Sequence, residues 1–371
     1  MTIGPVRRPY RVAVIGVGVI GACVGWHLSR QGAQVTLIDA GHPGEGVTDW
    51  SFSWVNASNK TARRPYFDLN LAGMAAYRDL ATTIGPDSWW HPSGHLRWTD
   101  DPAAQADLLK TAGLLTGLGY RAEVHTGAEV RRHLEPALTL PDEVAAVLYP
   151  DEAWVHGRHL VTRLVGRTVA EHRFGTAVTA IDTGSDGGVR TVTLSDGTRL
   201  DVDIIVNAAG PGAAHLAALL GRHLPMRHEP GLVTRITCAR TPIHRVVHAP
   251  HLALRPDGDT TMVLHSVELD AHLNPGEDPS PLTRLLHESA RNLIPALGDS
   301  RITESRVAER PIPADGYPSV GAVPSLPGYY EAVSHSGITL GPIIGRLLAT
   351  EILTGERAES LANFRPERLP A

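Results

Sequence analysis

The chain has 371 residues, 42% of them hydrophobic, which is enough for one large domain or two ordinary domains with a buried core. Its formal net charge of −5 at pH 7 gives no electrostatic reason to expect nucleic acid as the main partner. Two cysteines, Cys23 and Cys238, are too few for a disulfide framework or a zinc cluster, and they suit a reducing cytoplasm.

A strand–helix–strand unit is predicted at the N-terminus. Residues 11–15 are largely apolar and rich in β-branched side chains, which is typical of a strand buried on both faces of a parallel sheet. A helix is expected over residues 19–31, ending at Gly32, and a second strand over residues 34–38. Glycines interrupt the apolar run 12–26, so we expect neither a signal peptide nor a membrane span, and we expect a cytoplasmic protein.

A G-x-G-x-x-G motif of Gly16, Gly18 and Gly21 lies between the first strand and the helix. Gly16 permits a tight turn, Gly18 lets the backbone approach a pyrophosphate, and Gly21 lets the helix pack on the strand. Asp39, at the end of the second strand, can accept hydrogen bonds from ribose hydroxyls and would repel the 2′-phosphate of NADP. The unit predicts dinucleotide binding, against the alternative of a plain glycine-rich turn, and leaves NAD and FAD open.

Three later segments bear on that choice. Residues 44–56 form a loop rich in small and hydroxyl-bearing side chains. Residues 177–210 predict a strand meander followed by a buried strand that ends V-N-A-A-G. Residues 310–341 run from R-P-I-P-A-D-G-Y-P to the turn H-S-G-I-T-L-G, and residues 342–353 are predicted to form an amphipathic helix.

In this order, the motifs resemble those of the D-amino acid oxidase, sarcosine oxidase and glycine oxidase family over nearly the whole chain. The resemblance implies an α/β fold with a Rossmann-like, glutathione-reductase-type FAD-binding domain and a smaller α+β substrate domain with a mixed sheet. The FAD-binding domain would be assembled from residues 1–80, 150–222 and 308–371. Residues 81–149 and 223–307 would form the substrate domain.

The activity implied by the resemblance is FAD-dependent oxidation of a small amine or amino acid, with a D-, N-methyl or cyclic imino acid all fitting the scaffold. A hydride would pass from the C–H next to nitrogen to flavin N5, giving an imine that can hydrolyse. The electron acceptor would be oxygen or another compound. Residues 223–307 contain no lysine to assist oxygen chemistry, and Lys60, just past the hydroxyl-rich loop, is not favoured for that role.

The resemblance also assigns cofactor contacts. The glycine turn before the last helix would place that helix's N-terminus at the flavin ring, where it favours negative charge. The sarcosine oxidase branch attaches its flavin to a cysteine shortly before the proline-rich stretch, but residues 306–309 hold none, so we expect non-covalent FAD. The implied contacts are Gly16, Gly18, Val19, Ile20, Gly21, Asp39, Ala40, Thr48, Ser51, Ser53, Val178, Ala208, Ala209, Gly210, Gly337, Ile338, Thr339 and Leu340.

Five residues are candidates for the substrate side. His335 precedes the glycine turn and His265 lies on a predicted strand, so each is a candidate catalytic histidine or, alternatively, a structural one. Trp54 and Asn56 are candidates for the pocket wall, with packing in the core as the alternative for Trp54. Arg310 would bind a substrate carboxylate, unless it forms an ion pair with Glu309 or Asp315. No H-E-x-x-H motif occurs among the 19 histidines, and we expect no metal site.

Short strands are predicted at residues 232–236, 246–248 and 262–264, and a helix at residues 281–294. Oxidation of a 2-hydroxy acid or polyol by FAD is the nearest rival activity, and it would need a firm base such as His335. An NAD-dependent dehydrogenase and a non-catalytic flavin-binding subunit are the rivals from other classes.

Overall fold

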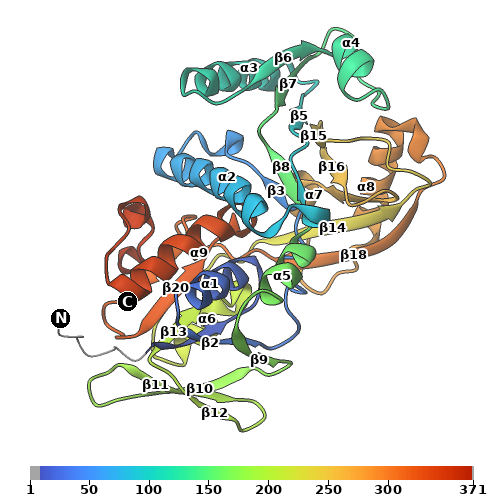
Figure 1. Cartoon of the computed structure of the whole chain (residues 1–371). Helices are drawn as coiled ribbons and strands as arrows, with labels where there is room; N and C mark the ends of the chain where they lie inside the picture. Colours follow the sequence, from blue (N-terminus) through green and yellow to red (C-terminus); the bar gives the residue numbers. More distant parts are fainter. Residues whose placement is uncertain (1–8, 370–371) are drawn as a thin grey trace.

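A computed structural model describes residues 9–369, in which two large sheets organise the chain (Figure 1). The first sheet is parallel except for its antiparallel edge strand β19. Val12 and Val14 face one hydrophobic cluster and Ala13 and Ile15 the other, so this sheet is covered on both sides, as its apolar sequence predicts. Its order is β19 (Ser319–Ala322), β20 (Tyr329–Val333), β13 (Ile204–Asn207), β1 (Arg11–Ile15), β2 (Gln34–Asp39) and β9 (Ala170–Phe174).

An antiparallel meander covers one face of the parallel sheet. It consists of β10 (Val178–Thr183), β11 (Val189–Leu194) and β12 (Arg199–Asp201), and Gly197 makes the last turn with a φ of +84°. The apolar side chains of β10 and β11 pack against those of β1 and β13. The strands predicted in this region are therefore confirmed.

Two helices lie on the opposite face, α1 (Val19–Arg30) and α9 (Gly337–Thr354). α2 (Arg64–Ile84) packs on α9, and α5 (Gly157–Val165) packs on α1. Figure 1 shows α9 (red) beside α1 (blue), although the two are far apart in the sequence. Their backbones approach so closely that a Cβ on Gly345 would stand 2.7 Å from the Cβ of Cys23.

The last helix begins five residues earlier than predicted, so the glycine turn is its first turn. Within residues 9–369, α9 is the one helix long and apolar enough to cross a membrane by length and composition, with a mean hydropathy of 1.2. Packing on α1 and α2 buries 67% of it. The helix is therefore longer than the one predicted, and its apolar side chains are explained by burial in the interior of the protein.

Pro342 is tolerated inside α9 because another helix replaces the hydrogen bond that it removes. A proline cannot donate to the carbonyl four residues before it, which here belongs to Ile338. The hydroxyl of Tyr77, on α2, donates to that carbonyl oxygen at 2.6 Å, and Tyr77 is fully buried. The contact fixes the first turn of α9 against α2.

The second sheet is mixed, with β15 and β5 parallel and its other neighbours antiparallel. The three predicted strands are found as β14, β15 and β17, whereas β5, β6, β7, β16 and β18 were not predicted individually. The predicted helix is α8 (Ser280–Leu293), whose Leu286 packs on the apolar face of this sheet. The strand order is β18 (Arg301–Glu309), β14 (Pro230–Thr237), β17 (Thr261–His265), β16 (Leu252–Pro256), β15 (Val246–Ala249), β5 (His95–Arg97), β7 (Ala145–Tyr149) and β6 (Glu123–Thr126).

A small sheet joins the segments between the two large ones. Its order is β3 (Trp54–Val55), β8 (Ala153–Val155) and β4 (Trp90–His91), and it places Trp54 next to the strands of the second sheet. The remaining α-helices are α3 (Pro102–Gly117), α4 (Gly127–Glu129), α6 (Ala213–Ala218) and α7 (Val267–Asp270).

Replacing Tyr77→Phe should lower the free energy of unfolding by about 1–3 kcal/mol, because the buried carbonyl of Ile338 loses its donor. Urea denaturation followed by circular dichroism measures the change. Tyr149→Phe is the matched control, since the hydroxyl of this buried tyrosine has no hydrogen bond to a described residue. Equal stability of the two variants would contradict the role given to Tyr77.

Candidate functional site

The backbone of the glycine loop packs so closely against its neighbours that two of its glycines have no room for a side chain. Gly16 has a φ of +92°, and a Cβ there would stand 2.4 Å from the carbonyl oxygen of Ala208. A Cβ on Gly21 would stand 1.9 Å from the carbonyl oxygen of Gly16, so Gly21 serves the packing of α1 on β1. Gly18 begins α1 without a capping side chain, and Thr48 Oγ1 accepts the hydrogen bond of Val19 N at 3.0 Å. A helix N-terminus exposed in this way favours an anion.

Asp39 ties the loop to the end of β2. One carboxylate oxygen accepts the N–H of Val17 at 2.7 Å and the other that of Gly41 at 2.9 Å. The carboxylate also borders the cavity above the glycine loop. Its position suits the ribose contact expected from the sequence.

The glycine-loop cavity, as we name the space lined by this loop, has a volume of about 210 Å³. It brings together twelve of the predicted cofactor residues from five separate segments: Gly16, Gly18, Val19, Ile20, Asp39, Thr48, Ser51, Ala208, Ala209, Gly210, Gly337 and Ile338.

The histidine cavity, of about 370 Å³, adjoins it. Residues that line both are Val47, Ser51, Pro311, His335 and Ile338, so the two spaces meet at the first turn of α9. The predicted residues Ser53, Trp54, Asn56, His265, Arg310 and Thr339 also line the histidine cavity.

Four predicted cofactor residues, namely Gly21, Ala40, Val178 and Leu340, line neither cavity as the structure places them. Leu340 is fully buried, and Val178 packs into the apolar cluster between β10 and the parallel sheet. Burial thus decides the positions of the Val178 and Leu340 side chains, whereas Ala40 is exposed after the end of β2.

Strain and unpaired polar groups mark the cavity wall. Ser53 holds a φ of +54°, which is uncommon for a residue with a side chain and is often found at functional sites. The side-chain oxygen of Asn56 is buried without a hydrogen-bond partner among the described residues. Ser336, at the N-terminus of α9, does not cap its own helix but lies 2.7 Å from the hydroxyl of Tyr66. The helix N-terminus therefore remains available to a ligand.

Three histidines of the cavity are driven toward the neutral form. The ring of His335 is open to the cavity, yet desolvation by the surrounding protein, with Lys60 and Arg310 nearby, lowers its pKa to about 3. Desolvation also lowers the pKa of His265, whose Nδ1 lies 3.2 Å from the carbonyl oxygen of Leu232. Burial lowers the pKa of His248, which sequence reasoning missed, well below its ordinary value.

Lys60 is not favoured from the sequence for a role in oxygen chemistry, but the structure places it on the wall of the histidine cavity. Burial, reinforced by Arg63, lowers its pKa to about 8, and its ammonium group has no ion pair with a described residue. The sequence signal for Lys60 is the rarity of lysine, because the 371 residues contain only two. Its reach into the cavity depends on the tertiary fold.

Arg310 lies at the cavity, but neither ion pair considered for it from the sequence forms. Its guanidinium group is in close contact with Asp270, and it pairs with Glu229 at 3.2 Å. The carboxylates of Glu309 and Asp315 are engaged instead by His228 and Arg368. Two carboxylates therefore offset the charge of Arg310, which weakens the case for it as the carboxylate anchor.

Glu152 is a buried support behind the cavity that sequence reasoning missed, because it stands in a short connection without a motif. It is fully buried and accepts hydrogen bonds from Trp54 Nε1 at 2.8 Å, the Tyr120 hydroxyl at 2.6 Å and Ser58 N at 3.2 Å. Its other neighbour is the Nδ1 of His95, also at 2.8 Å. The carboxylate thus fixes Trp54 and the loop that carries Lys60.

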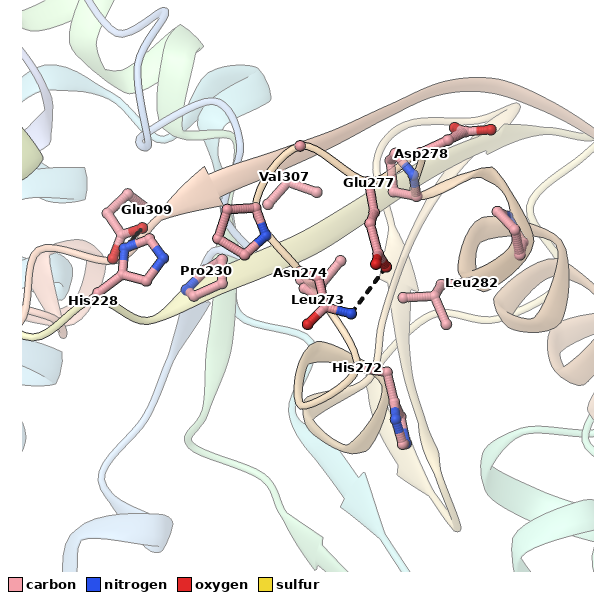
Figure 2. A pocket seen from close by; sticks show the side chains of 14 residues that line it. His228, Pro230, His272, Leu273, Asn274, Glu277, Asp278, Leu282, Val307 and Glu309 are labelled. Atoms are coloured by element: carbon pink, nitrogen blue, oxygen red, sulfur yellow. Dashed lines mark hydrogen bonds and ion pairs between the residues drawn. The ribbon is translucent and has the colours of Figure 1, made fainter.

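Figure 2 shows a further hollow, of about 440 Å³, on the outer side of the second sheet. It lies away from the glycine loop and is lined by His228, Pro230, Val307, Glu309 and most residues of the segment 272–282. Its polar side chains pair with each other, as His228 does with Glu309 at 2.9 Å and Asn274 with Glu277 at 2.9 Å. We therefore place the functional site at the two joined cavities.

Known proteins are similar to this chain over nearly its whole length. The profile of a family described as FAD dependent oxidoreductase matches residues 11–351. Glycine oxidase of Geobacillus kaustophilus is 25% identical over 96% of this chain and 96% of its own length, and its crystal structure superposes with a TM-score of 0.84 over 98% of this chain and all of the other. D-proline dehydrogenase of Pyrobaculum islandicum is 26% identical over 96% of this chain and 100% of its own. Iminodiacetate oxidase of Chelativorans sp. BNC1 is 26% identical, with a TM-score of 0.83 over 96% and 99%.

Replacing Asp39→Asn should weaken FAD binding about ten- to a hundredfold, because an amide nitrogen would face a backbone N–H that the carboxylate now accepts. Titration of the apoprotein with FAD, followed by quenching of flavin fluorescence, measures the dissociation constant. Asp68→Asn, on the exposed side of α2, is the control with the same change of charge. Unchanged affinity in Asp39→Asn would place the dinucleotide elsewhere.

Proposed function

The chain belongs to the DAO family of FAD dependent oxidoreductases, enzymes of amine and amino acid oxidation, and from this premise we propose that its joined cavities hold FAD and a small amino acid at their shared wall. The reaction would remove a hydride from the C–H next to the substrate nitrogen. The observation that carries the proposal is the junction at His335 and Ile338, which line both the glycine-loop cavity and the histidine cavity.

The residues around the glycine loop fit FAD. Gly16 and Gly18 allow a close approach of backbone to Ala208 and Thr48 that a side chain would prevent. The N-terminus of α1 and Asp39 both line the cavity beside this loop. When bound, FAD supplies a hydride acceptor. Cys23 is buried in α1 and Cys238 lies near Thr260, away from the cavity walls, which supports non-covalent binding.

The protein would orient the substrate through its charges. Lys60 is the cavity cation without an ion pair to a described residue, whereas Arg310 already contacts two carboxylates. We assign Lys60 to the substrate carboxylate. The Nδ1 of His265 donates to a backbone carbonyl, which leaves Nε2 as an acceptor for an N–H of the substrate.

The cavity would also favour the neutral amine, from which a hydride leaves most readily. The burial that lowers the pKa of Lys60 to about 8 and of His335 to about 3 acts equally on a substrate ammonium group placed beside them. The histidines would then serve as neutral hydrogen-bonding groups. A firm base for a hydroxy acid is not provided by such depressed pKa values, which disfavours the rival activity.

Anaerobic addition of amines, D- and L-amino acids and hydroxy acids to the holoenzyme tests the proposal. We expect the visible flavin absorbance to be lost with a compound that carries an oxidisable C–H next to nitrogen. Recovery on admission of air would distinguish oxygen from another acceptor. Loss of the flavin absorbance with hydroxy acids alone would support the rival activity. If neither nitrogen compounds nor hydroxy acids reduced the flavin, the proposal would be wrong.

The role of Lys60 predicts a pH dependence for carboxylate binding. Below pH 8 its ammonium group is charged, so the dissociation constant of propionate should be constant there and rise about tenfold per pH unit above it. Lys60→Arg should keep its affinity to higher pH, and Lys60→Met should bind weakly throughout. Isothermal titration calorimetry on the holoenzyme provides the values, and a flat wild-type profile from pH 7 to 10 would argue against the assignment.

A further inference from the structure

A basic hollow lies next to the histidine cavity, on the other side of Lys60 and His335. It has a volume of about 270 Å³. We call it the vestibule and define it by its lining: Asn59, Lys60, Ala62, Arg63, Tyr66, Arg227, Glu229, Ile312, Gly316 and His335. Asn59, Lys60, Glu229 and His335 also line the histidine cavity, so the vestibule is continuous with the place proposed for the substrate.

Two arginines converge in the vestibule. A Cβ on Gly316 would stand 2.8 Å from Arg63 Nη1 and 3.0 Å from Arg227 Nη2, so these two nitrogens lie within about 6 Å of each other. Arg63 donates to the carbonyl oxygen of Asp315 at 3.4 Å and stacks on the ring of Tyr317. Arg227 donates to the carbonyl oxygen of Ala314 at 2.9 Å. These partners are neutral, and neither arginine has a carboxylate partner among residues 9–369.

The acidic side chains nearby form their ion pairs with other cations. Glu229 borders the vestibule, but its carboxylate is engaged by Arg310 at 3.2 Å. The carboxylate of Asp315 faces Arg368 at 2.7 Å, and only its backbone oxygen meets Arg63. With Lys60 also unpaired, three cations share one hollow, an arrangement that repels itself until an anion enters.

The start of α2 adds to the positive potential. Arg63 is the N-cap of this 21-residue helix, and its first turn holds no acidic residue. The positive end of the helix dipole therefore points in the same direction as the arginine pair. Arg64, the next residue, is turned away and pairs with Asp68 at 2.9 Å.

From this geometry we propose that the vestibule binds a second anionic group of the substrate, so that the enzyme acts on amino acids with a carboxylate on the side chain or on the nitrogen substituent. The proposal rests on the proposed function for the position of the reacting carbon. Lys60, which reaches the inner cavity, takes the carboxylate next to that carbon. Arg63 and Arg227 line only the vestibule, so an anion that meets them is a different group.

Binding of two unreactive acids to the holoenzyme tests the proposal. Glutarate and butyrate differ by one carboxylate, and we expect glutarate to bind about tenfold more tightly. Arg63→Gln and Arg227→Gln should each weaken glutarate about three- to tenfold, leave butyrate within about twofold, and together abolish the preference. Calorimetry gives all the dissociation constants without turnover.

Two further variants test whether the effect depends on charge inside the vestibule. Arg64→Gln removes the same charge outside the vestibule and should leave both acids unaffected, whereas Arg63→Lys should retain most of the preference. Equal binding of glutarate and butyrate by the wild type would overturn the proposal. So would a loss in Arg64→Gln as large as that in Arg63→Gln, because the effect would then be one of general charge.

A matched pair of amines separates this proposal from the proposed function. Iminodiacetate and N-methylglycine are both secondary amines, and the first carries one more carboxylate. A higher kcat/KM for iminodiacetate that disappears in the double variant supports the vestibule site. Oxidation of both without preference would contradict the vestibule site and leave the proposed function standing. A preference for glutarate without oxidation of any amine would support the vestibule site and contradict the proposed function.

Discussion

The close approach of α1 and α9 is the constraint on which the rest of the site depends. Glycines at positions 337, 341 and 345 face α1, and a Cβ on Gly341 would stand 3.0 Å from a methyl group of Val19. The contact brings two helix N-termini, one at the glycine loop and one at Ser336, to the same wall. Because Tyr77 supplies the hydrogen bond that Pro342 cannot make, the first turn of α9 holds its place at that wall.

Burial of polar groups gives the cavity its chemical character. The carboxylates near the cavity make structural contacts: Glu152 accepts a hydrogen bond from Trp54, and Asp270 pairs with Arg310. The histidines that remain are held toward neutrality, and Lys60 is left as the unpaired cation of the described cavity wall. Such a site would select ligands by the positions of their charges and by the free energy of desolvating them. A strong acid or base would contribute little to that selection.

How far the sequence predicts this molecule depends on how local each feature is. β1, α1 and β2 follow from residues 11–39 alone, since periodicity, glycines and the terminal Asp39 all act within one unit. The start of α9 was missed because its support, the bond from Tyr77 to Ile338, spans 261 residues. Arg310 was given the wrong partners because Asp270 and Glu229 are brought to it by strand pairing. Lys60 and His248 join the site only through the tertiary fold.

A crystal structure of the complex with FAD would show whether cofactor and substrate meet where the two cavities join. We expect the isoalloxazine ring at the wall formed by Ser51, His335 and Ile338, with one face open to Lys60 and His265. A dinucleotide held at the glycine loop with its ring directed away from the histidine cavity would contradict it.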